Sequence, residues 1–105
     1  MRKVNWYRVK APQPWRPKLH EELIGTYLCT KQKIGEWGPY SIHLVKSRCQ
    51  IFYVSGAMVD NLFGLLQPET KVKLIFTGMR DSPGGRSYKT FELYTDEALK
   101  IAEVG

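Results

Sequence analysis

The order of hydrophobic and polar positions along the chain predicts five β-strands, at residues 22–34, 40–47, 48–56, 71–79 and 88–95. In most of these stretches hydrophobic side chains alternate with polar ones, which is the pattern of a strand with one buried face. Gly25 interrupts the first strand, and a glycine inside a strand indicates a bend or bulge, as at the corner of a barrel. We therefore expect an all-β domain whose long first strand is bent.

The same patterns predict which side chains of the second and third strands face away from the core. Residues 40–47 place His43 on one face with Ser41 and Val45, and we expect His43 to face outward. In the third strand Ile51 and Tyr53 share a face, because strand side chains alternate. We therefore expect Phe52 to face outward.

Between the third and fourth strands the hydrophobic spacing becomes that of a helix. Its apolar positions are Met58 or Val59, Leu62, Leu65 and Leu66. Ser55 is expected to cap the start of this helix, and Pro68 to help end it. We expect the helix to plug a barrel, and residues 96–105 to form a short helix or tail.

The N-terminal 21 residues differ from the rest in composition. Three prolines, Pro12, Pro14 and Pro17, make a regular helix unfavourable. Residues 1–18 carry six basic and no acidic residues, whereas residues 19–105 carry ten of each, so the whole net charge of +6 lies in residues 1–18. A basic arm on a neutral body favours a polyanionic partner. Alternatively, its aromatic residues, Trp6 and Trp15 among them, pack on the body while its cations stay in solvent or pair with acids.

Length and composition predict one small soluble domain at residues 22–95. The 105 residues contain no apolar run of membrane-spanning length and no signal peptide, so we expect a cytoplasmic protein without membrane contact, in the host cytoplasm if it is viral. Cys29 and Cys49 lack the spacing of a zinc site and are expected to be buried thiols rather than a disulfide.

The order of elements, strand-strand-strand-helix-strand-strand, resembles that of the OB-fold, a five-stranded Greek-key barrel. The resemblance covers residues 22–95 and includes "ELIGTYL", "YVSGAMVDNLFGLL" followed by "KVKLIFTG", and "SYKTFELY". More narrowly, the chain is similar to the small single-stranded-DNA-binding proteins of phages and related replicons. The resemblance implies non-sequence-specific binding of single-stranded DNA in replication or recombination.

In the OB-fold the ligand lies on strands two and three, between the loop that joins strands one and two and the loop that joins strands four and five. Here these loops would be "KQKIGEWGPY" and "MRDSPGGRSYK". Cations could follow phosphates there, and aromatic rings could stack on bases. The residues expected to bind nucleic acid are Lys31, Lys33, Trp37, Tyr40, His43, Arg48, Phe52, Lys73, Arg80, Arg86, Tyr88 and Lys89.

No sequence motif indicates catalysis. His20 and His43 lack partners at metal-ligand spacing, and "SPGGRS" lacks the spacing and lysine of a phosphate-binding loop. We therefore expect a protein that is not an enzyme, with no metal, cofactor or small-molecule substrate. Two alternatives stay open: an OB-like protein-interaction module of a larger assembly, phage structure included, and an RNA-binding OB domain. The arm and the exposed barrel edges make self-association into a homo-oligomer plausible.

Overall fold

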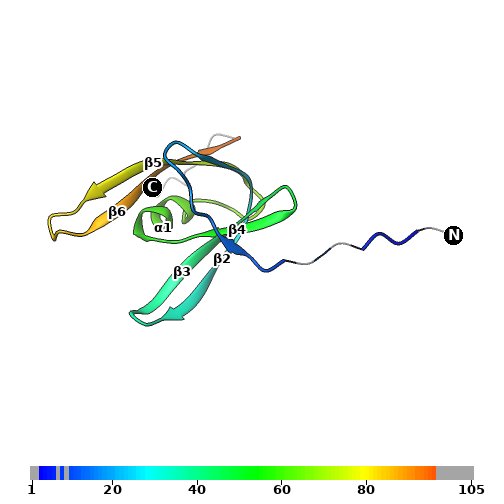
Figure 1. Ribbon diagram of the computed structural model, residues 1–105, viewed down its shortest axis with the longest axis horizontal. Helices are drawn as coiled ribbons and strands as arrows, with labels where there is room; N and C mark the ends of the chain where they lie inside the picture. The colour runs from blue at the N-terminus through cyan, green and yellow to red at the C-terminus, as the bar shows by residue number, and fades with distance from the viewer. Residues whose placement is uncertain (1–2, 7, 9, 97–105) are drawn as a thin grey trace, which may run out of the picture.

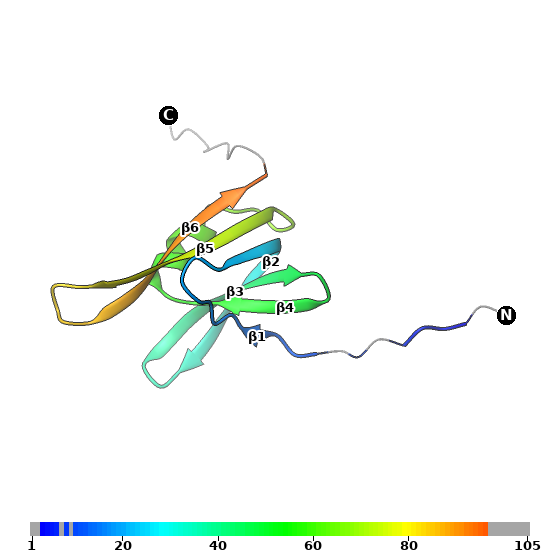
Figure 2. The ribbon, with the colours of Figure 1, turned by 45° about the horizontal axis from the view of Figure 1, so that its top comes forward.

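The protein folds around a single sheet of six strands that curls into a half-barrel (Figures 1 and 2). The computed structural model describes residues 3–6, 8 and 10–96, so the helix or tail expected at 96–105 lies, apart from Asp96, outside the described residues. The strands are β1 (Gln13–Pro14), β2 (Glu22–Gly35), β3 (Gly38–Ser47), β4 (Gln50–Val54), β5 (Lys71–Asp81) and β6 (Ser87–Thr95). One helix, α1 (Ala57–Phe63), lies between β4 and β5.

The expected all-β class and the position of the helix are confirmed, but the expected count of five strands is wrong. The five expected strands are β2 to β6, and β1 is a sixth. The order across the sheet is β1-β4-β3-β2-β5-β6, with antiparallel pairs except for the parallel pair of β1 and β4. Because β1 has only two residues, alternation could not reveal it; its pairing with Phe52 and Tyr53 defines it.

The long strand β2 changes partner next to Gly25. Thr26 pairs with Lys71 of β5 on one side and with Lys46 of β3 on the other. At Gly25 a Cβ atom would lie 2.2 Å from the backbone carbonyl oxygen of Lys46, so only glycine allows this approach. The expected corner is therefore found at Gly25, whereas the bulge of β2 lies between Tyr27 and Cys29.

The core lies on the concave side of the half-barrel, between the sheet and α1. It comprises Leu23, Tyr27, Val45, Val54, Val59, Phe63, Leu66, Val72 and Leu74. The helix contributes Val59 and Phe63, as a short helix with one buried face should. Ser55 does not cap it: Gly56 is the N-cap residue and makes no side-chain hydrogen bond.

The arm is docked on the body through Trp15. The backbone N–H of Trp15 donates to the carbonyl of Tyr53 (3.0 Å). Its ring packs on the core and lies 6.1 Å from the ring of Phe91 in β6. Trp15 thus connects β4 with β6, two strands that do not pair with each other. This agrees with the packed interpretation of Trp15, whereas Trp6 is 90% exposed.

Candidate nucleic-acid interface

Two hairpins extend from the body in different directions, with α1 between their bases (Figure 1). In the first, β2 and β3 pair as far as Gly35 and Gly38, so the turn consists of Glu36 and Trp37 alone. The segment expected as a loop from Lys31 to Tyr40 is therefore mostly paired strand. Trp37 is 97% exposed, so it does not pack on the body.

The second hairpin is formed by β5 and β6, which pair as far as Asp81 and Ser87. Its turn is held by its own hydrogen bonds: the Ser82 N–H donates to the Arg86 carbonyl (2.7 Å) and the Ser87 hydroxyl to the Asp81 carboxylate (2.8 Å). Arg86 lies in this turn. The segment expected as a long loop is therefore mostly paired strand, with a turn at residues 82–86.

Three of the four expected site residues of the second hairpin line one cleft between α1 and the hairpin. The cleft has a volume of about 640 Å³, and the three residues are Arg86, Tyr88 and Lys89. The fourth, Arg80, pairs with Tyr88 across the hairpin.

The sheet has a basic and aromatic face opposite the core, over β2, β3 and β4. Cross-strand pairing places Lys33 beside Tyr40, Lys31 beside Ile42, and Leu44 between Cys29 and Tyr53. Lys46 pairs with Ile51 further along. We call this surface the outer face; its residues are Cys29, Lys31, Lys33, Tyr40, Ile42, Leu44, Lys46, Ile51 and Tyr53.

The outer face has an apolar centre and a polar surround. Ile42 and Leu44 are buried, although neither belongs to the core cluster. Lys31, Lys33 and Lys46 are exposed, and Tyr40 is 47% exposed. Trp37 stands at one end of β3 and Arg48, in the turn to β4, at the other. Aromatic rings and cationic side chains therefore lie in a row along β3.

In both β3 and β4 the side chains predicted to face outward face the core, and their neighbours in the strand face outward. His43 and Phe52 point to the core side, and Tyr40 and Tyr53 to the outer face, as the pairing of Val45 with both Tyr27 and Phe52 requires. Phe52 is partly buried against the core. The physical reason is that residues 42–45 are all buried, so alternation in this strand does not distinguish the inner face from the outer one.

His43 is a structural residue rather than a surface one. It is 3% exposed, and its ring stacks on Phe63 with centroids 5.0 Å apart. Its Nδ1 shares a hydrogen bond with the Thr30 hydroxyl (2.8 Å), and its Nε2 with the Asp60 carboxylate (2.6 Å). Thr30 also bonds the hydroxyl of Tyr27.

A hydroxyl, an imidazole and a carboxylate in line are also the parts of an activated nucleophile. Here, however, the stacked ring is buried and the Thr30 hydroxyl is shared with Tyr27. The chain of hydrogen bonds therefore ties β2, β3 and α1 together. Sequence reasoning missed it because Thr30, His43 and Asp60 are far apart in the chain.

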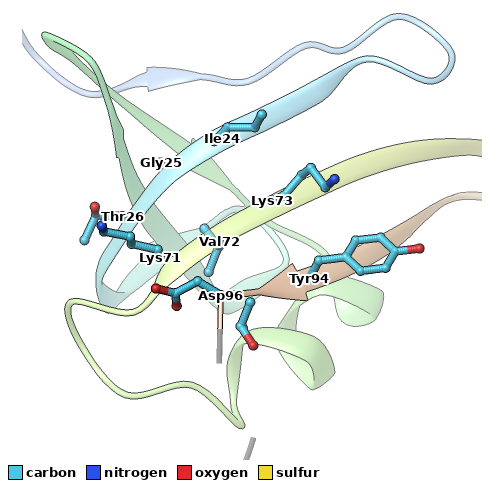
Figure 3. Close-up of a pocket in the computed structure, with 9 residues that line it drawn as sticks. Ile24, Gly25, Thr26, Lys71, Val72, Lys73, Tyr94 and Asp96 are labelled. Carbon is cyan, nitrogen blue, oxygen red and sulfur yellow. The ribbon is translucent and has the colours of Figure 1, made fainter. Parts of the chain in front are cut away.

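Lys73 lies apart from the outer face, in a second surface groove of about 680 Å³ over β2, β5 and β6 (Figure 3). Its Nζ stands 5.4 Å from the centre of the Tyr94 ring. The Tyr94 hydroxyl donates to Glu92, and this hydrogen bond and the carboxylate charge raise the pKa of Tyr94 above its ordinary value of 10.0. With Asp96 in the same groove, acids offset the lysines there.

Arg48 and Cys49 form the exposed turn between β3 and β4, and Arg48 has a left-handed backbone (φ 57°). The exposure of Cys49 contradicts the expectation of a buried thiol, while Cys29 is half-buried; both are free. The described residues include no group of three or more His, Cys, Asp or Glu side chains placed to hold a metal ion. No helix in the described part of the chain has the length and apolarity to cross a membrane.

Comparison with known proteins finds no matching family model, no similar curated protein and no similar solved structure.

Proposed function

We propose that this protein binds single-stranded DNA without sequence specificity, along the outer face of β2, β3 and β4. The observation that carries the proposal is a row of side chains that follows β3 from Trp37 to Arg48. It consists of three exposed lysines, the exposed Tyr40 and the half-buried Tyr53. Proteins that bind single strands combine cations along the phosphates with rings that stack on bases. A protein with this activity would coat single strands in replication or recombination.

The chemistry of the outer face favours binding without base reading. None of its residues is Asn or Gln, the side chains that recognise base edges most readily. Stacking is worth about 1–3 kcal/mol per base and tolerates any base. If Lys31, Lys33, Lys46 and Arg48 each contact one phosphate, log K should fall with log salt at a slope of about −3.

The fold supports the same proposal. The five strands β2 to β6, with α1 between the third and fourth, follow the chain order of the OB-fold, which is a partly open barrel. The outer face belongs to the strands that bind oligonucleotides in that fold, and the two hairpins are its flanking loops, lengthened. The main departure from the OB-fold is that β4 and β6 do not pair with each other; Trp15 connects them instead.

The tip of the first hairpin favours a second candidate, a protein-interaction module. Ile34 is 91% exposed there and pairs with Pro39, on the opposite side of the hairpin from Lys33 and Tyr40. An exposed aliphatic side chain beside Trp37 suits a protein hot spot better than a phosphate backbone.

One titration separates the two candidates. The probe is a labelled oligo-dT of about 30 nucleotides, long enough for any single site of this kind, at two salt concentrations. We expect binding that weakens as the salt concentration rises. Trp37→Ala should weaken it by about 1–3 kcal/mol, roughly 5- to 150-fold in Kd. The matched variant Ile34→Ala should bind like wild type.

Absence of binding at low salt would overturn the proposal and leave the interaction module. Competition with oligo-rU tests the RNA alternative: stronger competition by RNA than by DNA would indicate contacts to the 2′-hydroxyl.

A further inference from the structure

The arm consists of two parts with different environments. Residues 13–15 are docked on β4, and Trp15 is packed against the core. Before Gln13 every described residue is exposed, including Lys3, Trp6 and Arg8. None of the arm cations that the structure describes forms an ion pair.

The direction of the arm follows from the parallel pairing of β1 and β4. Because Gln13 pairs with Phe52, the residues before Gln13 run past the first residue of β4 and beyond the β3–β4 turn. The Gln50 side chain donates to the carbonyl of Ala11 (3.5 Å), which agrees with this path. Both views show the arm leaving the body on the side away from the two hairpins (Figures 1 and 2).

The arm therefore passes the β3–β4 turn, the end of the sheet at which Arg48 lies. Lys10 and Arg48 line one groove of about 700 Å³ at the β3–β4 turn, together with Glu22 and with Phe52, which points to the side opposite the outer face. Along β3 the cations and rings run from Trp37 to Arg48, and Lys10, Arg8, Trp6 and Lys3 continue in the same direction. Residues 3–10 can reach at most about 29 Å when fully extended.

We propose that the exposed part of the arm prolongs the outer face and binds the same nucleic-acid strand beyond the β3–β4 turn. This rests on the proposed function of the outer face. The arm supplies cations for phosphates and the Trp6 ring for one base, the same chemistry as the outer face. Its occupant is a polyanion because residues 1–18 carry six bases and no acid, whereas residues 19–105 have no net charge.

The test compares oligo-dT of about 8 nucleotides with oligo-dT of about 24. The short one fits within the roughly 4–16 nucleotides of a single site of this kind, and the long one is long enough to reach the arm as well. The variant is Arg8→Gln/Lys10→Gln, and the matched control is Lys71→Gln/Lys73→Gln, which removes two cations from the groove of Figure 3. We expect the arm variant to bind the short oligonucleotide like wild type. On the long one its salt slope should be shallower by about 1.4, two contacts at about 0.7 each. The control should keep both slopes.

The inference fails if the arm variant binds the long oligonucleotide with the wild-type slope while the short one still binds. It also fails if the variant lowers the molecular mass in solution without changing the slope, since the arm would then bind a second copy. If wild type binds neither oligonucleotide, the proposed function itself has failed. Trp6→Ala gives a second measurement, because it should reduce tryptophan quenching by the long oligonucleotide and leave quenching by the short one unchanged.

Discussion

At the scale of single residues, two positions on β2 and β3 carry more of the fold than their residue types suggest. His43 connects Thr30 and Asp60 through its two ring nitrogens, and Gly25 allows the backbone of β2 to approach Lys46. The sequence predicted a corner at Gly25 from the residue type alone. It could not predict the role of His43, because the partner carboxylate lies 17 residues further along the chain.

Removing the carboxylate partner of His43 should destabilise the protein. In Asp60→Ala the buried Nε2 loses its hydrogen-bond partner, and an unsatisfied buried polar group costs about 1–3 kcal/mol. Urea unfolding at neutral pH measures the change in the free energy of unfolding. Asn61→Ala, at the next and exposed position of α1, is the control and should change it little. Equal midpoints for Asp60→Ala and wild type would contradict the structural role of this pair.

The close approach of the two backbones at Gly25 predicts that even a single added methyl group destabilises the protein. Gly25→Ala would place a methyl group 2.2 Å from a backbone oxygen, so β2 and β3 must separate where β2 changes partner. We expect a loss of at least about 1–3 kcal/mol, the usual cost of overpacking. Gly84→Ala, whose Cβ meets only the Ser82 hydroxyl at 3.9 Å, is the comparison. Thermal unfolding that ranks the two substitutions equally would show that the strands do not cross as described.

At the scale of elements, the arm and the two hairpins decide what the sheet can do. The strand positions were predictable, because each of the five long strands has a hydrophobic pattern of its own. Their faces were not: in β3 four consecutive residues are buried, so only the pairing of Val45 with Tyr27 and Phe52 reveals the inner side. The short strand β1 has no pattern either and depends on its contact with β4.

Trp15 is the residue on which docking of the arm depends. Its ring packs on the core and on Phe91, and its N–H bonds Tyr53. Truncation of a packed tryptophan costs about 3–5 kcal/mol; because Trp15 is only half-buried, we expect about 2–3 kcal/mol for Trp15→Ala. The same variant should raise tryptic cleavage after Lys18, which is followed by Leu19. Wild-type stability and protection would show that the arm is not held by this contact.

At the scale of the whole molecule, the cationic and aromatic side chains of the outer face and the basic arm follow one direction, that of β3. The rings and cations of the outer face follow β3, and the basic arm continues beyond the β3–β4 turn. Of the residues expected to bind nucleic acid, Lys31, Lys33, Trp37, Tyr40 and Arg48 lie along this direction, whereas His43 and Phe52 belong to the inner side. Lys46 and Tyr53 were missed because their face had been assigned to the core.

The central claim is that a single strand lies on the outer face and reaches Trp37, and the three tryptophans allow a direct test. Their indole N–H signals can be followed by nuclear magnetic resonance during titration with oligo-dT of about 8 nucleotides, and assigned with single Trp→Phe variants. We predict that the signal of Trp37 moves and that the signal of Trp15, packed on the core, does not. If the Trp37 signal stays fixed at saturating oligonucleotide and low salt, no strand lies on the outer face as proposed.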